Sequence, residues 1–197
     1  MLLTSGKTKT VGGTTWTFPS RSDCMRCHGA AAGRSLGPEI AQLNRDLLYP
    51  ATGRVANQLE TLEHIGMFSA PLGRPASELP AYPWPNGNAA VDARARAYLH
   101  ANCSMCHRPN GNSGRAGMDF RFATPLAETK ACNVDPVVDD FGIAGAKIIA
   151  PGSPERSIVS LRVHDAGANR MPPLATHVVD EEGVFLLDGW IRALECR

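Results

Sequence analysis

The stretch RARAYLHANCSMCH, residues 94–107, carries the pattern that decides the fold of the second half of the chain. Its first part has apolar residues at helical spacing and predicts a helix over residues 92–101. This helix runs directly into Cys103, which opens the order Cys-x-x-Cys-His completed by Cys106 and His107. Each thiol of such a motif can form a thioether with a haem vinyl group, and the following histidine can bind the iron. The stretch therefore predicts a covalently attached haem c.

The same order occurs once more, earlier in the chain, at Cys24, Cys27 and His28. A zinc ribbon would place two Cys-x-x-Cys pairs about 15–20 residues apart, and a thioredoxin-type dithiol would accompany a βαβ pattern. The two pairs here lie much farther apart and a histidine follows each of them, so both alternatives fit the sequence less well. We expect two haem c groups, one on each motif.

Composition and charge narrow the class of protein. The chain has 197 residues and a formal net charge of +1, without the basic block that nucleic-acid binding favours. No stretch approaches the roughly 18 apolar residues that span a bilayer. The first residues, MLLTSGK, lack the apolar core of a signal peptide. We expect no nucleic-acid partner, no transmembrane segment, and either a signal that has been removed or replaced or a longer parent protein.

Two further helices are predicted in the second half. Acidic residues at 180–182 precede apolar residues at spacings of three and four, which predicts a final helix ending near Leu194. Ser153 as a cap and Pro154 at the first helical position predict a middle helix. We therefore expect an all-α, cytochrome c-like fold with extensive loops. The order of elements resembles the class I cytochrome c fold, in which the first and last helices cross.

The first half is less regular. Apolar spacing indicates one helix over residues 39–48 and another over residues 54–67. Residues 71–88 contain five prolines and no helical period, which is typical of an extended connector. We expect two haem-binding halves: residues 1–88, which include this connector, and residues 89–197.

The sixth ligand of each iron decides between a carrier and a catalyst, because two strong protein ligands leave no site for substrate. For the second haem we expect Met171, which two prolines follow in a rigid loop before the final helix. For the first haem, Met67 and His64 both lie at the end of the predicted 54–67 helix, on faces other than its apolar stripe. Met67 is favoured and His64 stays the alternative.

Other candidate ligands have simpler interpretations. His100 is expected to pack locally, His164 and His177 to lie at the surface or bind a haem propionate, and Met118 to belong to the core. Cys132 and Cys196 lie outside the two motifs. Because haem c is attached outside the cytoplasm, where disulfides persist, we expect these two cysteines to form a bridge, with two buried free thiols as the alternative.

Several segments together resemble a family of bacterial dihaem c-type cytochrome domains, which occur alone or joined to quinoprotein sugar-dehydrogenase-like propellers. The segments are Trp16–His28, Leu36–Pro38, Gln42–Arg45, Asn57–Leu59, Arg94–Cys103, Ala150–Pro154, Arg170–Pro173 and Asp188–Ile191. The resemblance implies a periplasmic electron-transfer module that serves a dehydrogenase or a respiratory chain.

The leading expectation is a two-haem carrier that passes single electrons between redox partners and is not an enzyme. One alternative is a dihaem peroxidase-like enzyme in which one haem is open to peroxide. Another is a haem-bearing domain or subunit of a larger dehydrogenase. We expect a periplasmic or otherwise extracytoplasmic location.

Overall fold

The computed structural model describes residues 2–36 and 39–196, so that Met1, Gly37, Pro38 and Arg197 lie outside the described residues. The chain forms two compact units. The large unit combines Met1–Leu36 with Trp84–Arg197, and the small unit is Gly37–Pro83. Two separate segments of the chain thus form the large unit, and each of them carries one Cys-x-x-Cys-His motif. The predicted division into haem-binding halves at residue 88 concerns the cofactors and stays a prediction.

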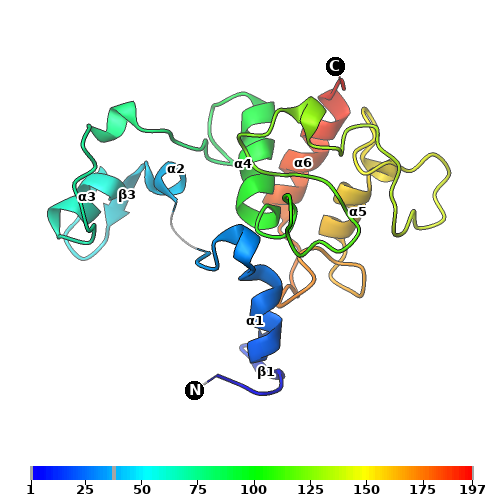
Figure 1. Ribbon diagram of the computed structural model, residues 1–197, viewed down its shortest axis with the longest axis horizontal. Helices are drawn as coiled ribbons and strands as arrows, with labels where there is room; N and C mark the ends of the chain where they lie inside the picture. The colour runs from blue at the N-terminus through cyan, green and yellow to red at the C-terminus, as the bar shows by residue number, and fades with distance from the viewer. Residues whose placement is uncertain (1, 37–38, 197) are drawn as a thin grey trace. The chain divides into compact units, whose positions relative to one another are not determined.

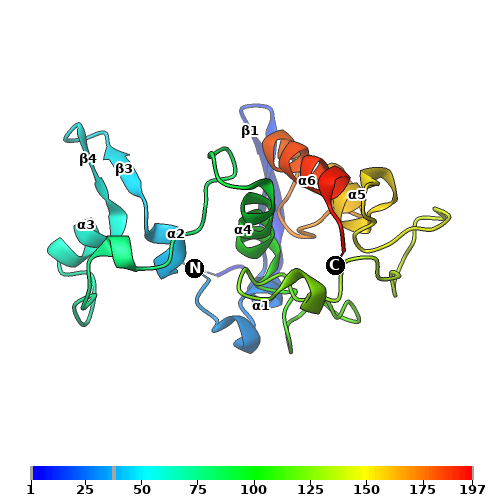
Figure 2. The same cartoon turned by 90° about the horizontal axis from the view of Figure 1, so that it is seen from above.

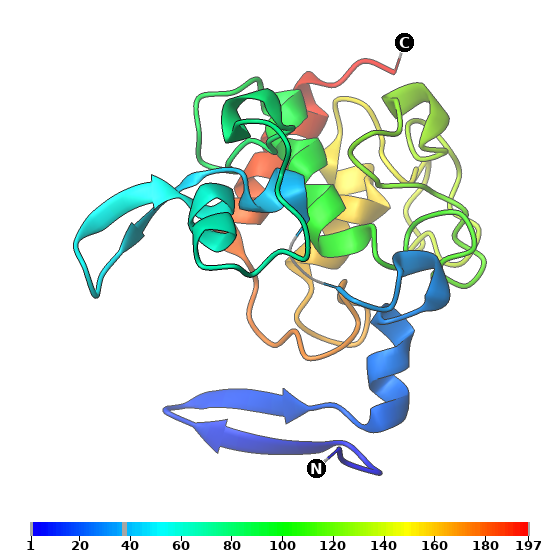
Figure 3. The ribbon, with the colours of Figure 1, turned by 60° about the vertical axis from the view of Figure 1, so that its left-hand side comes forward.

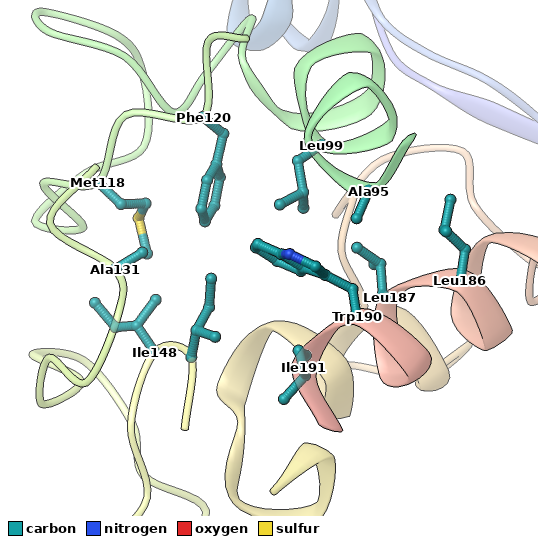
Figure 4. Close-up of a cluster of buried hydrophobic side chains, with 11 residues drawn as sticks. Ala95, Leu99, Met118, Phe120, Ala131, Ile148, Leu186, Leu187, Trp190 and Ile191 are labelled. Atoms are coloured by element: carbon teal, nitrogen blue, oxygen red, sulfur yellow. The ribbon is translucent and has the colours of Figure 1, made fainter. Parts of the chain in front are cut away.

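Two helices form the centre of the large unit. The predicted helix at 92–101 is confirmed as α4 (Val91–Cys103), and the predicted final helix is confirmed as α6 (Glu181–Ala193). The two helices pack against each other, as Figure 1 shows. Trp190 of α6 is 2% exposed, and Figure 4 shows its indole among the core side chains that include Leu99 of α4. Burial of this apolar surface is the main force that holds the helices together.

The close approach of α4 and α6 depends on a glycine. A Cβ atom at Gly183 of α6 would collide with the ring of Tyr98 on α4. Asp180 joins the same two helices, because it accepts the Tyr98 hydroxyl at 2.9 Å and caps α6 through the Gly183 N–H at 3.0 Å. Farther along, the Trp190 indole N–H donates to Asp92 at 3.0 Å. Apolar burial therefore drives the packing of α4 against α6, and these polar contacts fix how the two helices align.

The middle helix begins later than predicted. Pro154 opens a short 3-10 turn, η4 (Pro154–Arg156), and α5 spans Ile158–His164. Ser157 separates the two, and its buried hydroxyl accepts the Ala150 N–H at 2.8 Å and donates to the Ser153 carbonyl at 2.8 Å. Ser153 precedes the first helical residue, Pro154, as predicted, but this residue opens the 3-10 turn η4, and these bonds close that turn before the α-helix begins.

The N-terminal part of the large unit is a hairpin followed by a short helix. Strands β1 (Lys7–Val11) and β2 (Thr14–Phe18) pair antiparallel, and the helix α1 spans Arg21–Cys27 (Figure 3). Ser20 caps α1 through a capping box, in which its hydroxyl accepts the Asp23 N–H and the Asp23 carboxylate accepts the Ser20 N–H. The remaining short turns of the unit are η1 (Ala30–Ala32) and η3 (Leu126–Glu128).

The small unit holds the second hairpin. Its elements are α2 (Ile40–Leu43), β3 (Asp46–Tyr49), β4 (Arg54–Asn57), α3 (Gln58–His64) and the 3-10 turn η2 (Ala76–Glu78), and β3 pairs antiparallel with β4 (Figure 2). In each of the predicted helices, 39–48 and 54–67, one part is helical and the other part is a strand. Gly53, at a φ of 67°, turns the chain between the strands. Asn57 then caps α3 by accepting the Leu59 N–H at 2.9 Å, so the helix starts four residues later than predicted.

The expectation of an all-α fold is wrong. The described residues form a mixed α/β protein with 33% helix, 11% strand and two small antiparallel sheets. Both sheets come from segments in which turn residues bring two short extended runs together. In the first, Gly12 and Gly13 both have positive φ, the backbone that a tight hairpin turn requires.

Candidate functional site

The large unit contains a cavity of about 400 Å³, within the range of roughly 300–1,000 Å³ that is usual for ligand and cofactor pockets. Cys103, Cys106 and His107 of the second motif line it together with Met171, more than sixty positions later in the chain. Most of the other lining side chains are apolar, among them Met118, Phe120, Ile148, Ile158, Val159, Val163, Pro173 and Leu174. The fold therefore brings the predicted attachment residues and the predicted sixth ligand to one apolar cavity.

The second motif is positioned by the end of α4. Cys103 is the last residue of this helix, and its carbonyl accepts the N–H groups of Cys106 at 3.1 Å and His107 at 2.9 Å. The chain then turns back on itself at Gly111, where a Cβ atom would collide with the Cys106 carbonyl. The two thiols and the imidazole are thus presented from one helical turn that the core of the unit holds in place.

Two neighbouring side chains contact the His107 ring. Its Nδ1 lies 3.0 Å from the sulfur of Met118, and the ring of Phe120 is tilted against it at 5.6 Å between centroids. Burial, together with the positive charge of Arg162, lowers the pKa of His107. The neutral imidazole is the form that binds a metal. With the proton on Nδ1 toward Met118, the lone pair of Nε2 is available to a ligand.

Burial also governs the thiols of the second motif. It raises the pKa of Cys103 to about 12, with a smaller contribution from Cys106. It raises the pKa of Cys106 to about 11, and the neighbouring Cys27 thiol adds to this rise while Arg26 opposes it. Both thiols are therefore protonated and neutral at neutral pH, in keeping with the apolar lining of the cavity.

The loop that carries Met171 is anchored to the end of α5. The Met171 N–H donates to the Arg162 carbonyl at 2.9 Å, and the Arg162 guanidinium donates to the Asn169 carbonyl at 3.0 Å. Asp165 accepts two N–H groups of the same loop, those of Gly167 at 2.6 Å and Asn169 at 2.8 Å. These bonds anchor the part of the loop that comes before the two prolines, and they hold the Met171 backbone at the cavity.

The first motif lies on a far more exposed element. Every residue of α1 is half-buried or exposed, and Met25 is 45% exposed. His28 follows the helix, and its Nδ1 lies 2.7 Å from the Arg34 carbonyl. Cys27 and Arg26 nevertheless line the same cavity as the second motif. Sequence analysis missed this meeting of the two motifs, because it depends on how the N-terminal segment docks rather than on local pattern.

The two candidates for the sixth ligand of a first haem lie in the small unit. His64 ends α3, and Met67 follows it with 66% of its surface exposed. Since the first motif belongs to the large unit, the choice between Met67 and His64 stays a prediction.

The other predicted side chains have defined partners. His100 is buried and its Nδ1 accepts the Phe122 N–H at 3.0 Å. His164 lies 3.1 Å from the Asp188 carboxylate, and His177 is hydrogen-bonded to the Thr17 hydroxyl. Met118 is buried in the core as expected, and its contact with His107 is an additional role that only its distance in space reveals.

Cys132 and Cys196 lie at disulfide distance, with 5.8 Å between their Cα atoms. Cys132 also pairs with Ile149 in an isolated β-bridge. The bridge closes a loop of 64 residues that contains α5, the Met171 loop and α6.

Residues 2–36 and 39–196 contain no group of three or more His, Cys, Asp or Glu side chains placed to hold a metal ion by themselves. A structural zinc site would require four such ligands around one point. In the same part of the chain, none of the helices is both long enough and apolar enough to cross a membrane. Comparisons of the chain with protein-family models, with curated proteins and with solved structures found no match.

Proposed function

We propose that this protein carries two covalently attached haem c groups and transfers single electrons between redox partners. One observation carries the proposal: a single apolar cavity gathers Cys103, Cys106, His107 and Met171. These are two thiols for attachment and one candidate ligand for each side of an iron, drawn from two distant parts of the sequence.

The residues of the cavity fit a haem group. Its apolar walls suit the macrocycle, and the neutral thiols and imidazole suit thioether formation and iron ligation. Arg26 and Arg162 also line the cavity and supply cations for the haem carboxylates. A bound haem supplies a one-electron iron couple, and ligation by histidine and methionine raises its potential. The role of the chain is to hold the ligands and to exclude water.

The first motif supports the second cofactor. Cys24 and Cys27 would attach the first haem and His28 would bind its iron, with Met67 favoured over His64 as the sixth ligand. A dihaem peroxidase-like enzyme, in which neither side chain binds the iron and the first haem has an open side, is the alternative function. A haem-bearing domain of a larger dehydrogenase would use the same residues.

The environment of the protein is part of the proposal. Haem c attachment takes place outside the bacterial cytoplasm, and the Cys132–Cys196 pair is compatible with such an oxidising compartment. We therefore favour the periplasm, with a dehydrogenase or a respiratory-chain component as the redox partner. This environment agrees with the proposed role of the protein as a bacterial dihaem cytochrome.

A haemochrome assay and an optical spectrum of the purified protein test the proposal. We expect two haems per chain, and a weak absorption near the red end of the ferric spectrum that reports methionine sulfur on iron. Met171→Ala should remove the contribution of one haem to this band, whereas the control Met25→Ala, at an exposed position, should leave the band intact. A preparation without covalent haem would overturn the proposal. A high-spin signal from one of two haems in the unaltered protein would favour the peroxidase-like alternative.

A further inference from the structure

The two motifs touch through equivalent residues. Cys27 is the second cysteine of the first motif, and Cys106 is the second cysteine of the second motif. The Cys106 thiol donates at 3.3 Å to the carbonyl of Arg26, the residue next to Cys27. Both cysteines line the 400 Å³ cavity. The sulfur atoms that would carry corresponding thioether bonds of the two haems are therefore neighbours.

Polar side chains of the second motif's loop secure this contact. The Asn112 amide donates both to the Met25 carbonyl at 3.0 Å and to the Arg26 carbonyl at 3.1 Å. The last carbonyls of a helix lack partners within the helix, and here Asn112 and Cys106 supply them for α1. Arg108 adds a third anchor by donating to the Ala31 carbonyl at 3.0 Å.

The backbone of the first motif leaves room for this anchor. A Cβ atom at Gly29, the residue after His28, would lie 2.7 Å from the Asn112 amide nitrogen. Only glycine lets the amide reach the end of α1 without displacement. Three hydrogen bonds and one close approach thus act on the end of α1, and the bond from Arg108 acts on the following turn η1. Together they form a defined junction between the two motifs.

We propose that this junction, formed by Met25–Gly29 on one side and Cys106–Asn112 on the other, is a positioning contact that would keep the two attachment motifs, and therefore the haems attached to them, close enough to be coupled. The inference rests on the proposed function, since it requires haem on both motifs. One electron can then pass directly between the haems inside the chain. Oxidation of one iron would add a positive charge near the other, so the second oxidation would become harder.

The holoprotein itself gives the first test. Electron paramagnetic resonance of the fully oxidised protein should show spin–spin interaction between the irons, and a redox titration should resolve two separated one-electron steps. Asn112→Ala should weaken the spin interaction and bring the steps closer by about tenfold in the one-electron equilibrium, about 59 mV. Asn86→Ala removes a single exposed hydrogen bond to Glu182 and serves as the matched control, with both readouts unchanged.

The outcomes separate the inference from the function on which it rests. Two haems with additive, non-interacting spectra in the unaltered protein would overturn the junction and leave the electron-transfer proposal standing. Fewer than two haems in the unaltered protein would overturn the proposed function. If Asn112→Ala fails to load haem, Gly29→Ala is the second variant, because its Cβ displaces the amide while every hydrogen-bonding group remains. An unchanged spin interaction in a fully loaded Gly29→Ala protein would contradict the role of the junction.

Discussion

The two Cys-x-x-Cys-His motifs share one spacing but have very different surroundings. The second motif ends α4, a thirteen-residue helix that buries four residues in the core. The first motif lies on α1, a seven-residue helix whose residues are all half-buried or exposed. An isolated helix of that length is marginal in water. Under the proposed function, the pentapeptide would specify where a haem is attached, and the fold around it how far that haem is enclosed.

The difference also shows what holds each motif. Core packing of α4 against α6 supports the second, independently of the first. The capping box at Ser20 supports the start of α1, and side chains of the second motif's loop support its end. The first motif thus depends structurally on the second, and this dependence leads to unequal effects when the motifs are altered.

Removal of the attachment cysteines should give the largest effect. Cys103→Ser with Cys106→Ser and Cys24→Ser with Cys27→Ser should each lower the haem content from two to one per chain. Without the haem, the apolar lining of the second motif's cavity would be exposed to water, which should destabilise the large unit. We expect the first double variant to lose cooperative thermal unfolding and the second to keep it.

The opposite order of stability of the two double variants would contradict this comparison of the motifs. If the Cys24 and Cys27 variant were the less stable of the two in circular dichroism melting, enclosure by the core would not distinguish the motifs.

The disulfide should have the next largest effect. Cys132→Ser with Cys196→Ser opens a loop of 64 residues and should cost about 2–4 kcal/mol of unfolding free energy in denaturant titration. The haem content should remain at two per chain, because neither cysteine lines the cavity. Reduction of the unaltered protein should reproduce the loss, and a denaturation curve unaffected by both treatments would contradict the bridge.

The helix contact behind the second motif offers a smaller and more local test. Gly183→Ala places a Cβ atom in the ring of Tyr98 and should cost about 1–3 kcal/mol through overpacking. Gly189→Ala, on the same helix, is the control: among the described residues its Cβ would meet open space, and alanine should stabilise the helix by up to about 1 kcal/mol. Chemical denaturation measures both, and equal effects of the two substitutions would show that α4 and α6 do not pack this tightly.

The same contrast explains what the sequence could predict. Long periodic segments predicted α4 and α6, because their apolar stripes match the packing that stabilises them. The segment around Gly53 forms a hairpin instead, because local turn geometry outweighed a weak helical period there. The Thr-rich run before α1, for which no helix was predicted, forms the other hairpin. Helical spacing over a few residues cannot distinguish the two outcomes, and this made the all-α expectation wrong.

The candidate site, too, was only partly predictable from the sequence. Motif spacing alone predicted both attachment sets, which stay predictions. The loop chemistry around Met171 predicted its place beside the second motif, and Met171 lines the same cavity as that motif. The meeting of Cys27 with Cys106 joins parts of the chain far apart in sequence through bonds to backbone carbonyls. Backbone carbonyls leave no mark in the side-chain pattern, so this contact is visible only in three dimensions.

The smallest effect concerns two carboxylates, one beside each motif. Asp119 lies between Met118 and Phe120, the neighbours of His107. Burial alone would raise the pKa of Asp119, but hydrogen bonds from Arg121 and Thr124 and the charge of Arg121 lower it to about 2. Beside the first motif, hydrogen bonds from the Ser20 hydroxyl and N–H lower the pKa of Asp23, with a further contribution from Arg26.

A lowered pKa in the folded state stabilises the protein at any pH above the unfolded value, about 3.9, and the stabilisation disappears as the pH falls through the folded value. For Asp119 this window runs from about pH 4 down to about pH 2, and the loss is at most about 2 kcal/mol. Asp119→Asn should therefore flatten the acid limb of the stability curve. Asp23→Asn should leave global stability unchanged and instead speed amide hydrogen exchange in α1 above pH 4. If Asp23→Asn lowered global stability as much as Asp119→Asn, α1 would belong to the core of the fold, and the two motifs would differ less than their exposure indicates.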